Sequence, residues 1–146
     1  MAVFNKINDW VDYLVEDVDC ASDQFMVALS NTAPAAETPI PTADGNGVLA
    51  NVTQVAYTNL DGVNPRNITT TSSSQTGGTY KLVLADLTLT ASGGSVGPFQ
   101  YVYIYDDTVT DDPLVCYYDY GSSITLNDGE SLLIDFHDTN GFFQLA

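Results

Sequence analysis

The sequence predicts a mainly β protein: an antiparallel β-sandwich of Ig-like or jelly-roll-like type, with about eight or nine short strands and a short N-terminal amphipathic helix. Beyond residue 20, apolar and polar residues alternate over short runs, which is the period of half-buried strands. Turn-forming residues separate these runs at spacings of roughly 8–12 residues, as in sandwiches. With 146 residues, 45% of them hydrophobic, we expect one domain over 1–146, with a helix or arm in 1–19 and the sandwich in 20–146.

The N-terminal segment 1–19 has a helical period. Its apolar residues recur at spacings of three and four, and acidic residues fill the opposite side; the apolar set is Ile7, Trp10, Val11, Leu14, Val15 and Val18. Asn5 is the expected N-cap. Because Glu16, Asp17 and Asp19 would face the negative pole of the helix dipole, an extended arm is the alternative.

The remaining elements are expected to be strands and turns. A shift of alternation at Ala85-Asp86 predicts a bulge or bend, and Asn127-Asp128-Gly129 predicts a tight turn. A proline- and glycine-bearing loop is expected over 32–47, and a polar loop follows the Thr-rich edge strand at 67–71. The expected strands are 24–30, 48–59, 67–71, 79–92, 98–107, 114–120, 122–126, 131–136 and 141–145.

The run PFQYVYIY at 98–105 places an aromatic residue at every second position. Strand alternation predicts one aromatic row, formed by Phe99, Tyr101, Tyr103 and Tyr105. The opposite face carries apolar residues too, so both faces should be covered. We interpret the row mainly as core, with Tyr105 open to solvent beside the following acidic loop. If the fold leaves the opposite face bare, a partner subunit should cover it.

The charge balance excludes several partners. There are 19 acidic residues against three basic ones, a formal net charge of −16. Phosphate backbones and acidic membrane surfaces are repelled by such a field, so neither nucleic acid nor membrane is an expected partner. The N-terminal segment lacks a basic region followed by an apolar run, so export by a signal peptide is not expected. Strong acidity instead favours docking onto a basic protein surface, and such docking should weaken as the salt concentration rises.

Cys20 and Cys116 are the only cysteines. They are expected to be buried free thiols rather than a disulfide, because a reducing compartment is expected. Two thiols and the single histidine, His137, cannot complete a tetrahedral zinc site.

No residue pattern predicts catalysis. A nucleophilic triad needs a histidine, and the only one is His137, with no Gly-x-Ser-x-Gly elbow in the sequence. We therefore expect no enzyme and no cofactor. The local candidate for a metal is a weak calcium site, for which the rival interpretation is a solvated acidic loop. Its candidate ligands are Asp106, Asp107, Asp111 and Asp112.

Two long stretches, residues 79–107 and 112–136, resemble a family of small structural proteins encoded by tailed bacteriophages. Residues 22–34 and 49–59 fit the same pattern in the same order. Family members often begin with a less acidic segment and carry an extra aromatic residue where this chain has Cys116-Tyr117. The resemblance implies a virion component assembled in the host cytoplasm, namely a decoration or cement protein on the capsid exterior. Its partners would be the major capsid protein or another virion protein.

A homo-oligomer is expected from the strand that is apolar on both faces. The candidate partner-facing residues are Trp10, Val11, Leu14, Val102, Ile104 and Tyr117. The alternative function is a tail- or fibre-associated carbohydrate-binding module, in which exposed tyrosines stack against host glycans. Its candidate stacking residues are Tyr103, Tyr105, Tyr117, Tyr118 and Tyr120.

Overall fold

A computed structural model describes residues 2–146 and confirms the predicted mainly β, antiparallel sandwich with one short helix near the N-terminus. The helices are α1 (Trp10–Glu16) and two 3-10 turns, η1 (Pro34–Ala36) and η2 (Leu49–Asn51). The strands are β1 (Val3–Lys6), β2 (Phe25–Ser30), β3 (Asn67–Ile68), β4 (Thr70–Thr76), β5 (Thr79–Leu84), β6 (Leu87–Thr90), β7 (Val96–Asp106), β8 (Leu114–Leu126), β9 (Ser131–Ile134) and β10 (Phe143–Leu145).

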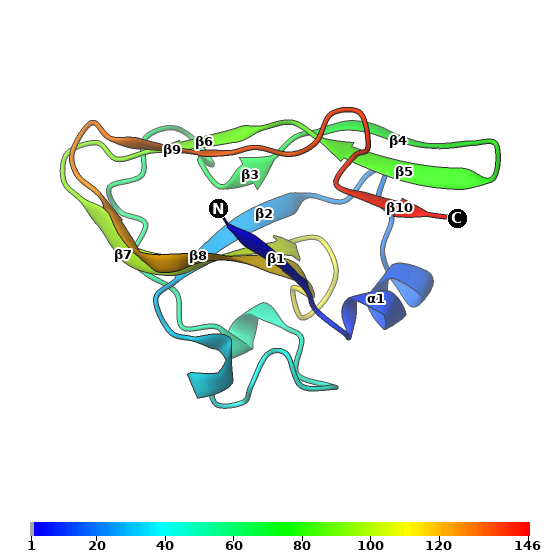
Figure 1. Cartoon of the computed structure of the whole chain (residues 1–146), viewed down its shortest axis with the longest axis horizontal. Helices are drawn as coiled ribbons and strands as arrows, with labels where there is room; N and C mark the ends of the chain where they lie inside the picture. The colour runs from blue at the N-terminus through cyan, green and yellow to red at the C-terminus, as the bar shows by residue number, and fades with distance from the viewer. Residues whose placement is uncertain (1) are drawn as a thin grey trace.

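The strands form two layers (Figure 1). One layer is a five-stranded sheet in the order β1-β8-β7-β2-β3, and the other contains the three-stranded sheet β10-β5-β4 and the pair β6-β9. Every pairing is antiparallel. Strands β1 and β10 each lie at an open edge of their sheet.

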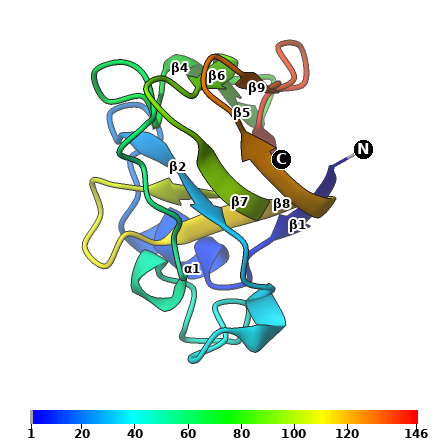
Figure 2. The ribbon, with the colours of Figure 1, turned by 90° about the vertical axis from the view of Figure 1, so that its left-hand side faces the viewer.

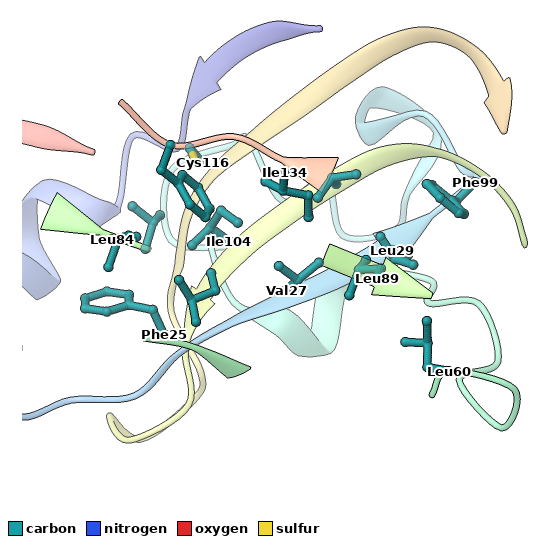
Figure 3. Close-up of a cluster of buried hydrophobic side chains, with 14 of the residues drawn as sticks. Phe25, Val27, Leu29, Leu60, Leu84, Leu89, Phe99, Ile104, Cys116 and Ile134 are labelled. Carbon is teal, nitrogen blue, oxygen red and sulfur yellow. The ribbon is translucent and has the colours of Figure 1, made fainter. Parts of the chain in front are cut away.

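The main core fills the space between the layers (Figure 3). Val27 and Ile104 from the five-stranded sheet are fully buried in the same cluster as Leu84, Leu89 and Ile134 of the opposite layer. The face bearing Val102 and Ile104 is therefore covered by the chain itself. These apolar contacts are what holds the two layers together.

A second core lies on the outer side of the five-stranded sheet. The aromatic residues Tyr101, Tyr103 and Tyr105 pack there with Ala28 and Val52. The chain between β2 and β3, with its two 3-10 turns, crosses this face, as the cyan segment in Figures 1 and 2 shows. The predicted coverage of β7 on both sides is confirmed, and an irregular segment supplies the second cover.

Two details of the aromatic row differ from the prediction. Phe99 belongs to the main core, with Val102 and Ile104, because register shifts on both sides of Phe99 invert its phase. Tyr105 is buried rather than open to solvent. It lies in the second core, where Leu49 of the segment between β2 and β3 and Met26 of β2 pack against the core.

Other expectations are corrected at the level of elements. Residues 48–59 form the turn η2 and irregular chain rather than a strand. Isolated backbone hydrogen bonds hold this segment, such as the one that Val55 N donates to Leu29 O at 2.9 Å. The polar stretch after residue 71 is strand, because β4 pairs with β5. Residues 114–126 form one strand rather than two, and ten strands are present among residues 2–146. The break at Ala85-Asp86 is confirmed, but it separates two strands of different sheets.

The N-terminal segment combines both predicted alternatives. Val3–Lys6 is an extended arm that pairs with β8, and only Trp10–Glu16 is helical. Asp9, not Asn5, is the N-cap residue, and its carboxylate accepts hydrogen bonds from the backbone of Gly45 and Gly47 at 3.0 and 2.8 Å. At the start of segment 1–19, the hydrogen bonds between β1 and β8 decide the conformation, although the sequence there has a helical period.

Gly141 is expected to be far less tolerant of alanine than Gly129. Both glycines have a positive φ, +77° and +85°, so alanine is strained at either position. A Cβ at Gly141 would also lie 2.6 Å from the carbonyl oxygen of Leu82, whereas a Cβ at Gly129 meets nothing within 4 Å. Thermal unfolding should show Gly141→Ala to be the less stable variant by roughly 1–3 kcal/mol. Equal losses would contradict the close approach of the turn before β10 to β5.

Candidate functional site

An apolar groove lies on the side of the sandwich where β1, α1 and β10 meet. It encloses about 330 Å³. Its lining residues are nearly all apolar: Phe4, Lys6, Trp10, Val11, Leu14, Val115, Phe142, Phe143, Gln144 and Leu145. In Figure 1, α1 and β10 lie on the right-hand side, and β1 lies near the centre.

The spacing of residues in each element directs these side chains to the groove. Phe4 and Lys6 alternate on β1 and therefore share one face. Trp10 and Leu14 are one helical turn apart on α1. Trp10 forms the buried base, with edge contacts to Phe25 of the five-stranded sheet and to Phe143 of β10, at centroid separations of 6.2 and 6.4 Å.

The rim of the groove exposes apolar side chains to solvent. Phe4 is 50% exposed, Val11 48% and Leu145 56%. A single exposed leucine or valine does not indicate a binding site, but several exposed apolar side chains around one apolar hollow are typical of an interaction site. This groove is therefore the candidate functional site.

An acidic hollow of about 590 Å³ lies on the other side of α1. It is lined by Asn8, Asp9, Asp12, Tyr13, Glu16, Asp17, Asp44 and Gly45. The carboxylate of Asp9 is occupied by backbone hydrogen bonds from Gly45 and Gly47. Asp12 and Glu16 are exposed and one helical turn apart. Helix α1 thus separates an apolar surface from an acidic one.

The structure brings together three of the six predicted partner-facing residues. Trp10, Val11 and Leu14 all line the groove. The prediction for Val102 and Ile104 is wrong, because the second layer buries both completely and leaves no surface for a partner. Self-association around that strand accordingly loses its basis. Tyr117 is half-buried in the second core, against Tyr101 and Tyr103.

Sequence reasoning missed the contributions of Phe4, Phe142, Phe143 and Leu145. Residues 141–145 were expected only as a strand, and Phe4 was not assigned a role. The available signal was the apolar content at both ends of the chain. What it lacked was the information that β1 and β10 lie at edges on the same side of the sandwich.

The acidic loop after β7 does not gather its carboxylates as metal ligands. Within residues 2–146, no cluster of three or more acidic, histidine or cysteine side chains is arranged to hold a metal ion. Asp106 Oδ1 instead accepts hydrogen bonds from the backbone N–H groups of Thr108, at 2.9 Å, and Val109, at 3.3 Å. It caps the turn of the loop, while the side chains of Asp107 and Asp111 are exposed.

The carboxyl group of Asp106 is fully buried, and its Oδ2 has no hydrogen-bond partner among the described residues. Burial raises the pKa of Asp106 to about 6, and the nearby negative charge of Asp23 acts in the same direction. The two backbone hydrogen bonds to Oδ1 oppose this rise. Asp106 is thus a structural residue with an altered titration.

The side chain of His137 stabilises a turn. Its Nδ1 accepts hydrogen bonds from the backbone N–H groups of Thr139 and Asn140, at 3.2 and 3.1 Å, in the connection between β9 and β10. The side chain is exposed. This arrangement positions the chain that leads to Phe142 and Phe143.

Both cysteines are free and buried, as predicted. Burial raises the pKa of the Cys20 and Cys116 thiols, which disfavours the reactive thiolate. They pack in the main core as small apolar side chains.

Two of the five tyrosines proposed for glycan stacking are inaccessible, and the other three are partly buried. Tyr103 and Tyr105 are buried, and Tyr118 and Tyr120 pack against the main core. Burial raises the pKa of all four hydroxyl groups. Tyr103 and Tyr105 cannot present a ring face to a sugar.

Removing the hydroxyl group of Tyr103 is expected to stabilise the fold. Its oxygen is buried without a hydrogen-bond partner anywhere in residues 2–146, and such a group costs about 1–3 kcal/mol. Tyr105 provides the matched control, because its hydroxyl contacts Met26 Sδ at 3.5 Å and accepts from Arg66 at 3.4 Å. Urea unfolding should therefore place Tyr103→Phe above wild type and Tyr105→Phe at or below it. The reverse order would contradict the burial assigned to the two hydroxyl groups.

Comparisons with protein-family models, curated proteins and solved structures find no match to this chain. No helix within residues 2–146 has the length and apolar character needed to cross a membrane. Function has to be inferred from the fold and its surfaces.

Proposed function

We propose that this chain is a structural virion protein of a tailed phage, which decorates or cements the capsid exterior through protein–protein contacts and performs no catalysis. The observation that carries the proposal is the apolar groove with its exposed rim of Phe4, Val11 and Leu145. An exposed apolar patch on a strongly charged protein is typical of a surface that a partner protein covers.

The charge and the resemblance support the same assignment. A formal charge of −16 keeps the chain soluble before assembly and favours a partner surface with basic groups. The resemblance of residues 79–107 and 112–136 to small phage structural proteins indicates the kind of particle. The major capsid protein is the first candidate partner, and another virion protein is the second.

The test is mass spectrometry of particles purified by density gradient from the phage that encodes the chain. We expect the protein at a fixed, symmetry-related ratio to the major capsid protein. Its absence from intact particles would overturn the proposal. Particles that contain it only in tail fractions would move it from the head to the tail.

A variant pair tests whether the groove mediates the attachment. Particles lacking the protein would be incubated with purified wild type, Val11→Asp or Leu133→Asp. Val11 and Leu133 are both exposed, but only Val11 lines the groove. Val11→Asp should fail to bind the particles, and Leu133→Asp should bind as wild type does.

A further inference from the structure

The groove and the acidic hollow share helix α1. Going around the helix from Trp10 and Leu14, one meets Val11 and Val15 and then Asp12 and Glu16, since successive residues turn by about 100°. Val11 and Val15 are both exposed. An apolar surface therefore passes without interruption into an acidic one across a single exposed helix face.

The strands beside the groove add a second feature. Among residues 2–146, β1 pairs only with β8, and β10 pairs only with β5. Each leaves one row of backbone N–H and C=O groups without a strand partner, and such edges accept an added strand. An extended segment lying in the groove could form hydrogen bonds with an edge while its alternate side chains enter the apolar hollow.

We propose that the groove binds an extended segment of a different protein, with apolar residues at alternate positions and basic residues beside them that reach Asp12 and Glu16. This inference rests on the proposed docking function and specifies the chemistry of the partner. The basic residues belong on the α1 side, because Lys6 lines the groove at β1.

A second copy of the chain is a poor occupant on the same grounds. Each copy carries a formal charge of −16. Two copies in contact would bring two strongly negative charges together, which costs free energy. A partner of opposite charge gains from the same surface.

The test uses the single tryptophan as a reporter. Trp10 is the only tryptophan of the chain and lines the groove, so its fluorescence should change when the groove is filled. The probe is the end-blocked peptide Lys-Val-Thr-Val-Thr-Val-Lys. Its two matched controls replace lysine by glutamate or valine by serine. We expect saturable binding of the first peptide alone, weakening as salt rises from about 0.05 to about 0.5 M.

Variants separate the apolar contribution from the charge. Val11→Asp should weaken binding of the basic apolar peptide by roughly tenfold or more, whereas Leu133→Asp, outside the groove, should not. Val11 is in the first turn of α1, where an acidic residue suits the helix dipole, so the fold should persist; circular dichroism checks this. Replacing Asp12 and Glu16 by Asn and Gln should weaken binding and flatten its salt dependence. The same neutralisation at the exposed residues Asp61 and Asp138 should do neither.

Three results would overturn the inference. The first is equal binding of the basic and acidic peptides, and the second is binding that Val11→Asp does not affect. The third is a concentration-dependent dimer in sedimentation that Val11→Asp abolishes, which would make a second copy the occupant. If the chain is absent from virions but still binds the peptides as expected, the proposed function is wrong and this inference stands. If the chain is present in virions but its peptide binding shows no charge preference, the proposed function stands and this inference is wrong.

Discussion

Replacing Trp10 by alanine is expected to remove about 3–5 kcal/mol of stability, the range for a buried large aromatic side chain. Trp10 is 4% exposed and contacts Phe25 of one layer and Phe143 of the other. Its loss opens a cavity at the point where α1 closes the side of the sandwich. The free energy of unfolding of a small domain is only about 5–15 kcal/mol in total, so this variant should be close to unfolding.

Urea unfolding followed by circular dichroism measures this effect, because the variant lacks the fluorescent residue. Val15→Ala is the matched control on the same helix, since Val15 is exposed. We expect its effect to stay within about 0.5 kcal/mol. A Trp10→Ala loss as small as that of Val15→Ala would show that α1 does not stabilise the sandwich.

Replacing Asp106 by asparagine is expected to change how stability depends on pH. The pKa of Asp106 is about 6 in the folded chain and 3.8 in the absence of the fold. Between these values the folded chain binds a proton that the unfolded chain releases, so the contribution of Asp106 to stability is fully present below about pH 4 and is lost as pH rises through about 6. Asparagine stays neutral, keeps an oxygen for the Thr108 and Val109 N–H groups, and can donate to Asp23.

Asp106→Asn should therefore equal wild type near pH 4 and exceed it at pH 7.5, by about 1–3 kcal/mol as for other buried unpaired polar groups. The measurement is urea unfolding of both proteins at several pH values. Taking the difference between them removes the general repulsion among the acidic residues. Asp107→Asn, at the exposed neighbouring position, should follow the wild-type profile. A constant offset between wild type and Asp106→Asn at all pH values would contradict the raised pKa.

Much of the fold was accessible from alternation and turn residues. The strand at 24–30, the break at Ala85-Asp86 and the turn at Asn127–Gly129 depend on short-range patterns, and all three are present. Most of β4 was missed because the serines at its positions 72–74 are typical of loops, and its pairing with β5 decides its conformation.

The phase of Phe99 shows a limit of alternation. Gly97 lies within β7, just before the aromatic run, with φ +118°, and a Cβ there would lie 2.7 Å from the carbonyl oxygen of Ile124. Glycine inside a strand is a known sign of a bulge, so the irregularity could have been anticipated. Its effect on which layer Phe99 faces depends on the partner strand β8, which the local sequence does not specify.

The candidate site was only half predictable. Trp10, Val11 and Leu14 were identified from the helical period, because amphipathicity is a local property. Val102 and Ile104 were assigned to a partner because a strand apolar on both sides needs two covers, and the sequence does not say that residues 31–66 can provide one. That segment has no strand alternation, yet Val52 and Leu49 in it complete the second core.

The groove also links partner binding to the completion of folding. Its walls come from Val3–Lys6 and from Phe143–Leu145, two strands that are far apart in the sequence. Until β10 joins β5, Phe142 and Phe143 are not in place and there is no groove for a partner to enter. The proposed docking surface is therefore absent from partly folded molecules, and a partner that binds it would select molecules in which both strands are in place.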